Sequence, residues 1–137
     1  MQDVSEATMT SLRLATVNGL RTNRLSVSKR RKIFTWLKKL NLDFVFLQET
    51  HADETCERLW LNEWGGEGFF ANGTDISRGV AILLKPGFRV KVMKIHRDPT
   101  GRFVVLELTM QGAKLVLCND TGPIRMSQPL LKGCAKY

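Results

Sequence analysis

The residues best placed to do chemistry are four consecutive polar residues, Gln48, Glu49, Thr50 and His51, which directly follow an apolar run. That run, residues 44–47, predicts a strand that is buried on both faces. A carboxylate such as Glu49 at the exit of a buried strand loses solvation free energy unless a divalent cation or hydrogen-bond donors pair with it. The pattern fits a metal-binding carboxylate, and it also fits a strand that ends in a solvated polar turn. Spacing alone favours the solvated turn.

Composition limits the class of protein that these residues can belong to. The chain has 137 residues, with 21 Lys and Arg against 13 Asp and Glu, and a formal net charge of +8. This length allows one domain with a hydrophobic core. The excess of positive charge favours a polyanionic partner, with nucleic acid first and an acidic membrane surface second.

Cysteine usage and hydropathy indicate the compartment. The chain has three cysteines, Cys56, Cys118 and Cys134, without the CxxC spacing of a zinc site or a disulfide framework. No stretch approaches the roughly 20 apolar residues of a membrane span, and residues 1–10 lack the apolar core of a signal peptide. We therefore expect an intracellular protein, nuclear or cytoplasmic, that does not associate with membranes.

Hydrophobic periodicity predicts an α/β start followed by antiparallel strands. Residues 11–17 alternate as a half-buried strand does, residues 29–40 have helical spacing, and the buried strand at 43–48 follows. A strand, a helix and a strand in this order usually form a parallel pair with a right-handed crossover. A second helix is expected at 53–64. Further strands are expected at residues 69–71, 79–84, 88–96, 102–110 and 113–118.

The helix expected at 29–40 combines an apolar stripe with a basic face. Its cations are Lys29, Arg30, Arg31, Lys32, Lys38 and Lys39. A solvated basic face and a direct contact with phosphate explain them about equally well. The tryptophans Trp36, Trp60 and Trp64 are expected in the core or at an interface, not as platforms for stacking bases.

Three segments, in this order, carry a resemblance to a known family. They are Thr-Val-Asn-Gly-Leu at 16–20, Phe-Leu-Gln-Glu-Thr-His at 46–51 and Arg-Gly-Val-Ala-Ile-Leu at 78–83. Together they resemble the exonuclease–endonuclease–phosphatase superfamily. With Ala-Asn-Gly at 71–73, the pattern is most similar to LINE-type retrotransposon endonucleases, which are themselves similar to apurinic/apyrimidinic endonucleases. The resemblance extends from Leu12 to Asn119 and covers about the first half of such a domain.

The resemblance implies a fold and a division of the chain. The expected fold class is α/β, a four-layered α/β sandwich truncated to about its first half. A flexible leader is expected at residues 1–10, a partial endonuclease/exonuclease/phosphatase domain at 11–119, and an irregular tail outside the family pattern at 120–137. Half of a sandwich would leave an apolar sheet face exposed, so we expect either a poorly stable fragment or a protein partner that covers this face.

The resemblance also assigns site residues, position by position. Glu49 matches the family's metal-binding glutamate, and Asn18 matches a site residue after the first strand, so these two are the catalytic candidates. The implied cofactor is Mg²⁺ or Mn²⁺, and the implied substrate is DNA. Contacts with substrate or phosphate are expected at Thr16, where the family usually has Asn, and at Asn18, Asn119 and His51.

Departures from the family pattern bear on activity. Thr121 replaces the tyrosine of the family's Asn-x-Tyr-Ala-Pro, and the later Gly-Asp-x-Asn and closing Ser-Asp-His have no counterpart. Loss of a catalytic base or a charge-stabilising donor typically lowers a rate by ~10²–10⁴ each. We expect a fragment of a Mg²⁺-dependent DNA endonuclease, of the retrotransposon or abasic-site (DNA repair) type, that is inactive alone. The alternatives are a non-catalytic basic nucleic-acid-binding module and a non-functional product of a decayed mobile element.

Overall fold

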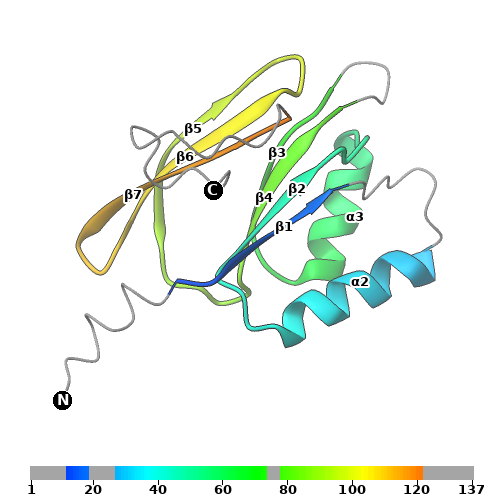
Figure 1. Ribbon diagram of the computed structural model, residues 1–137, viewed down its shortest axis with the longest axis horizontal. Helices are drawn as coiled ribbons and strands as arrows, with labels where there is room; N and C mark the ends of the chain where they lie inside the picture. Colours follow the sequence, from blue (N-terminus) through cyan, green and yellow to red (C-terminus); the bar gives the residue numbers. More distant parts are fainter. Residues whose placement is uncertain (1–11, 19–26, 74–77, 122–137) are drawn as a thin grey trace.

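The computed structural model describes residues 12–18, 27–73 and 78–121. Figure 1 shows two β-sheets that face one another, with two helices on the outer side of one sheet. The expected mixed α/β class with two sheets is confirmed. The elements are β1 (Leu14–Asn18), α2 (Val27–Lys39), β2 (Phe44–Gln48), α3 (Glu54–Trp64), β3 (Gly68–Ala71), β4 (Val80–Leu84), β5 (Lys91–Arg97), β6 (Phe103–Met110) and β7 (Ala113–Asp120).

The four-stranded sheet has the order β1-β2-β4-β3. Strands β1 and β2 are parallel, with Leu14 opposite Phe44, as the strand–helix–strand pattern predicts. Strand β4 runs antiparallel to both β2 and β3, so β1, β2 and β3 all point the same way. Their last residues, Asn18, Gln48 and Ala71, therefore lie along one edge of the sheet, which we call the carboxyl edge.

The two helices cover the outer face of this sheet. In their core, Phe34 of α2 contacts Trp60 of α3 edge-to-face, with ring centroids 5.8 Å apart. Helix α3 begins at the N-cap Asp53, and it ends at Gly65, which has a left-handed φ of 82°. Within the described residues, no helix is long and apolar enough to cross a membrane.

The basic helix differs from the sequence prediction at two positions. Trp60 and Trp64 are each 1% exposed, as expected of core residues, but Trp36 lies outside the core and is 56% exposed. Arg30 was assigned to a basic face that is either solvated or in contact with phosphate, yet it is only 6% exposed. Its Nε donates to Glu63 Oε1 at 2.7 Å, and this ion pair joins α2 to α3.

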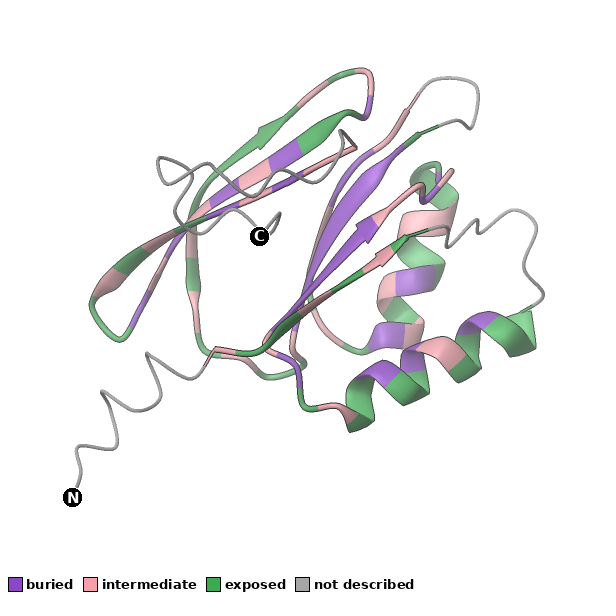
Figure 2. Cartoon of the chain, in the orientation of Figure 1, coloured by how far each residue is buried: buried purple, intermediate pink, exposed green. Residues whose placement is uncertain are grey.

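The second core lies between the two sheets, where the purple strands of Figure 2 face one another. The three-stranded sheet has the order β5-β6-β7, and β6 alternates between buried and outward positions. Its buried residues Val104, Leu106 and Leu108 pack against Phe44 and Phe46 of β2 and their neighbours. Because the chain supplies strands to both sheets, the inner face of each sheet is covered.

The apolar sheet face that the truncated sandwich is expected to expose is therefore not an inner face. Four large apolar side chains of the three-stranded sheet are exposed, by 36% to 54%: Met93, Ile95, Phe103 and Val116. The described residues form three of the four expected layers, namely the helices and the two sheets.

Several strand boundaries differ from the sequence prediction, among them those of β1, which covers Leu14–Asn18 instead of 11–17, and those of β5 and β7. Strand β5 begins at Lys91 instead of Phe88, because a turn at Gly87 with φ 77° precedes it and Phe88 packs into the inter-sheet core. Strand β7 continues to Asp120, two residues beyond the predicted end at 118. The predicted leader at 1–10 lies outside the described residues, and so do residues 122–137 of the predicted tail.

Candidate functional site

The backbone at the end of β2 has an unusual conformation. Glu49 and His51 have positive φ angles of 53° and 51°, and Arg78, opposite them on the segment that enters β4, has 62°. The left-handed region costs roughly 1–3 kcal/mol per non-glycine residue, and it persists only where the surroundings impose it. We call residues 49–51 the Glu49 turn.

Backbone hydrogen bonds hold the Glu49 turn against the start of β4. Thr50 N donates to Gly79 O at 3.1 Å, and His51 N donates to Arg78 O at 2.8 Å. Gly79 has φ 98°, and a Cβ there would lie 2.3 Å from Oγ1 of the fully buried Thr50. A glycine at position 79 is thus what allows the two segments to approach.

A buried amide supports the turn from the other sheet. Asn119 of β7 is 0% exposed, and its Nδ2 donates to Leu47 O at 3.0 Å and to Ala81 O at 2.9 Å. Its Oδ1 accepts a hydrogen bond from Gln48 Nε2 at 2.7 Å. Two of these hydrogen bonds tie Leu47 and Gln48, the residues just before Glu49, to the three-stranded sheet, and the third ties β4 to it.

The carboxylate of Glu49 remains open to solvent. Its side chain is 37% exposed, and its Oε1 lies 3.2 Å from His51 Nε2. The His51 side chain is 16% exposed and thus more buried than the carboxylate that it contacts. The imidazole thus contacts one of the two carboxylate oxygens of Glu49.

Two of the predicted residues come from β1. Asn18 is the register partner of Gln48, and Thr16 is the partner of Phe46. Ala15 and Val17 pack toward the helices, so the alternating Thr16 and Asn18 project from the opposite face, and both are exposed. The fold thus places Asn18 beside the Glu49 turn at the carboxyl edge, with Thr16 two residues farther from it.

The oxygen atoms of Glu49 and Asn18 suit a divalent cation that is bound partly by the protein and partly by the substrate. Among the residues that the structure describes, no group of three or more His, Cys, Asp and Glu could hold a metal ion. Mg²⁺ normally takes one or two carboxylates and completes its coordination with water and substrate phosphates. Glu49 fits as the single carboxylate ligand, and Asn18 fits as a neutral oxygen donor from the neighbouring strand.

Comparison with known proteins identifies the fold. No protein-family model matches the sequence. The human nocturnin catalytic domain with bound sulfate matches with a TM-score of 0.61 and 18% identity, over 85% of this chain and 51% of that one. D. rerio TDP2 complexed with a single-strand DNA product gives 0.57 and 23%, over 78% and 44%. An AP endonuclease from Archaeoglobus fulgidus gives 0.57 and 21%, over 82% and 41%.

These solved structures belong to the exonuclease–endonuclease–phosphatase superfamily. The chain has the exonuclease–endonuclease–phosphatase fold. It spans about half of the length of the structures that it matches, between 41% and 51% for the three above.

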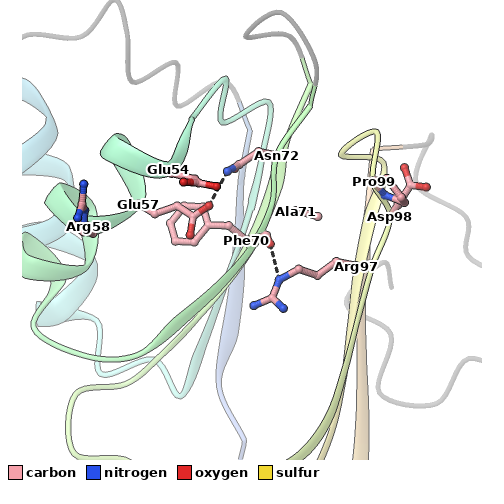
Figure 3. Close-up of a pocket in the computed structure, with 9 residues that line it drawn as sticks. All are labelled: Glu54, Glu57, Arg58, Phe70, Ala71, Asn72, Arg97, Asp98 and Pro99. Carbon is pink, nitrogen blue, oxygen red and sulfur yellow. Dashed lines mark hydrogen bonds between the residues drawn. The ribbon is translucent and has the colours of Figure 1, made fainter.

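A pocket at the far end of the carboxyl edge was missed by sequence reasoning. It has a volume of about 570 Å³ and lies between α3, the end of β3 and the β5–β6 turn (Figure 3). Asn72 Nδ2 donates to Glu57 Oε2 at 2.5 Å, and Arg97 Nε donates to Phe70 O at 2.9 Å. Burial raises the pKa of the Glu57 carboxyl group.

The sequence did contain one indication of this pocket. Asn72-Gly73 ends the short strand β3, and Glu57 lies in the first turn of α3, which begins just after the Glu49 turn. Both segments must meet at the carboxyl edge once β3 runs parallel to β2. This arrangement depends on the pairing of β3 with β4, which hydrophobic periodicity along the chain does not predict.

Proposed function

We propose that this chain is part of a Mg²⁺-dependent DNA endonuclease of the exonuclease–endonuclease–phosphatase type, with Glu49 as its metal ligand. The observation that carries the proposal is the Glu49 turn. A strained, left-handed glutamate is held from both sheets, and its carboxylate still faces solvent. Such strain gathers at functional sites, where it positions a group in advance.

The residues of the carboxyl edge have distinct roles in this proposal. Glu49 supplies one carboxylate oxygen to Mg²⁺ or Mn²⁺, and His51 fixes the direction of that carboxylate. Asn18 and Thr16 offer an amide and a hydroxyl to a phosphate oxygen. Asn119, expected to contact substrate, instead positions the turn from below, because its amide groups bond within the protein. A bound divalent cation would neutralise charge on the phosphodiester.

We also propose that cleavage of DNA requires a second polypeptide segment. Among the described residues, no group of three or more His, Cys, Asp and Glu gathers around Glu49 to complete a metal site. Strands β1 and β7 are edge strands on the same side of the sandwich, with β7 packed over β2 and β4. Open strand edges are where a complementing polypeptide pairs. We infer that this chain needs such a segment to cut DNA, and the relatives' greater length supports this inference.

The test combines metal binding with cleavage. Mn²⁺ bound in the presence of a single-stranded oligonucleotide would be measured from the loss of the free-ion EPR signal. We expect weaker binding in Glu49→Ala and unchanged binding in Glu67→Ala, an exposed glutamate outside the site. Equal binding by Glu49→Ala and the wild type would refute the metal role.

Nicking of supercoiled plasmid with Mg²⁺ or Mn²⁺ tests completeness separately. We expect no nicking above background from the chain alone. If the wild type nicks the plasmid and Glu49→Ala does not, Glu49 remains the proposed metal ligand. The proposed need for a second segment would then be overturned.

A second candidate is a non-catalytic basic nucleic-acid-binding module. The +8 charge and the cationic helix α2 favour it. In this case DNA affinity should fall steeply with salt and should not depend on Mg²⁺ or on Glu49. Binding that requires both Mg²⁺ and Glu49 would exclude this candidate.

A further inference from the structure

Helix α2 has a charge pattern that helix formation does not explain. Its 13 residues include six Lys or Arg and no Asp or Glu, and its first turn has no acidic residue. Cations near a helix N-terminus are unfavourable, because the helix dipole is positive there. Arg30, Arg31 and Lys38 each contact Glu63 of α3, whereas Lys32 and Lys39 are exposed on the outer face of the helix.

The outer face of α2 also presents an aromatic ring. Trp36 is 56% exposed and borders a shallow hollow of about 330 Å³. The opposite face of the helix is anchored by Phe34 and Leu37, each 1% exposed. The hollow is lined by residues at helical spacing on one face: Arg31, Lys32, Thr35, Trp36 and Lys39. Trp36 thus lies where it contributes little to the core.

We propose that this α2 face binds single-stranded nucleic acid, with one base stacked on Trp36 and neighbouring phosphates on Lys32 and Lys39. Single-strand-binding surfaces combine aromatic rings, on which bases stack, with cations that follow the backbone. The side chain of Arg31 is 69% exposed, and its Nε lies 3.7 Å from Glu63 Oε2, so it adds charge at the rim of the hollow.

The same features disfavour two other polyanions. Bases of a duplex present only their edges in the grooves, so an exposed indole gains little there. A helix that lies on an acidic membrane inserts a broad apolar face. The apolar face of α2 is buried against the sheet, and one tryptophan is its main exposed apolar group near the hollow.

This surface is separate from the Glu49 turn. Figure 1 shows α2 outside the four-stranded sheet, running back from the carboxyl edge toward the opposite edge. Trp36 lies in the second half of the helix, and Glu49 lies at the carboxyl edge. The inference therefore does not rest on the function proposed for Glu49.

The experiment measures anisotropy of a dye-labelled oligothymidylate in EDTA, which removes any contribution of divalent cations. Trp36→Ala should raise Kd by roughly 5- to 150-fold. Leu59→Ala is the matched control, because Leu59 is a 51% exposed apolar residue on α3. Its Kd should match that of the wild type, and the urea midpoint of both variants should be unchanged.

Charge is tested with two double variants that each remove two lysines. Lys32→Ala with Lys39→Ala should reduce the salt slope of binding by roughly 1 to 1.5. The control, Lys91→Ala with Lys114→Ala, removes exposed lysines of the three-stranded sheet and should leave the slope near the wild-type value. An equal change in both pairs would mean binding by overall charge and would overturn the proposal.

Further outcomes decide the site and the partner. Unchanged affinity in Trp36→Ala would overturn the proposal, as would a duplex that binds as tightly as the single strand. The chain should not bind vesicles of phosphatidylserine and phosphatidylcholine. If it binds these vesicles and does not bind the oligonucleotide, the surface is a membrane-binding surface instead. Because EDTA removes any divalent cation, this assay reports on the α2 surface without the Glu49 site, so failure of the α2 surface and failure of the Glu49 site are distinguishable.

Discussion

Replacement of Asn119 by leucine tests how the two sheets hold the Glu49 turn. Leucine keeps the branch at Cγ but carries two methyl groups in place of the amide oxygen and nitrogen, so it is somewhat larger and all three hydrogen bonds disappear. Each bond contributes roughly 0.5–1.5 kcal/mol net, and a buried carbonyl left without a partner costs roughly 1–3 kcal/mol. The oxygens of Leu47 and Ala81 lose this donor, and the three bonds together give a loss of about 1.5–4.5 kcal/mol. That is a large fraction of the roughly 5–15 kcal/mol that stabilise a domain.

Urea denaturation followed by circular dichroism measures this loss. With a typical slope, the midpoint should fall by roughly 1–3 M. Asn62→Leu makes the same substitution at an exposed position of α3, and it should change stability by no more than about 0.5 kcal/mol. A loss below about 1 kcal/mol in Asn119→Leu would refute the view that this amide is the main link beneath the site.

The variant Asn119→Asp adds a pH dependence of known sign. Its carboxylate would face two carbonyl oxygens in a fully buried place, which raises its pKa in the folded state. The folded state then binds the proton more tightly than the unfolded state, so stability falls as pH rises through the folded pKa. The deficit relative to the wild type should be smaller in mildly acidic than in neutral buffer. A deficit independent of pH would contradict this account.

Two further predictions concern the supports of the site and of the helix layer. Glu63→Ala leaves Arg30 buried without its carboxylate and should cost about 3–5 kcal/mol in a urea titration, a loss that the exposed control Glu67→Ala should not show. Because the bond from Arg30 lowers the Glu63 pKa, the wild-type stability contributed by this pair is present above the unfolded pKa and is lost as pH falls through the folded pKa. Gly79→Ala brings a Cβ against Thr50 and should destabilise the chain more than Gly112→Ala, which shares a positive φ but has open space; equal losses would argue against the clash.

Local features of the fold were predictable because they depend on neighbouring residues. The parallel β1–β2 pair with its intervening helix follows from the change in hydrophobic period along the first 50 residues. The ends of α3 follow from Asp53, whose carboxylate accepts from Cys56 N, and from Gly65, which adopts the left-handed conformation. Glu49 was identified from the polar cluster that ends a buried strand.

The features that no local pattern predicted join residues far apart in the chain. Arg30 is buried because Glu63, 33 positions later, accepts both of its hydrogen bonds. Trp36 is exposed because Phe34 and Leu37 already fill the helix–sheet interface. The spacing of apolar residues along a helix predicts the direction in which each side chain points. It does not predict how much of that side chain the neighbouring surface covers.

The sequence by itself determined the elements, the basic charge and the glutamate at the end of β2, since these depend on residue type and short-range spacing. Only the tertiary structure decided how that glutamate is held. The left-handed Glu49 turn requires Gly79, which directly precedes β4. It also requires Asn119 of the other sheet, 71 positions beyond Gln48. Such contacts form when two sheets pack face to face, and their pairing depends on the whole core instead of any one segment.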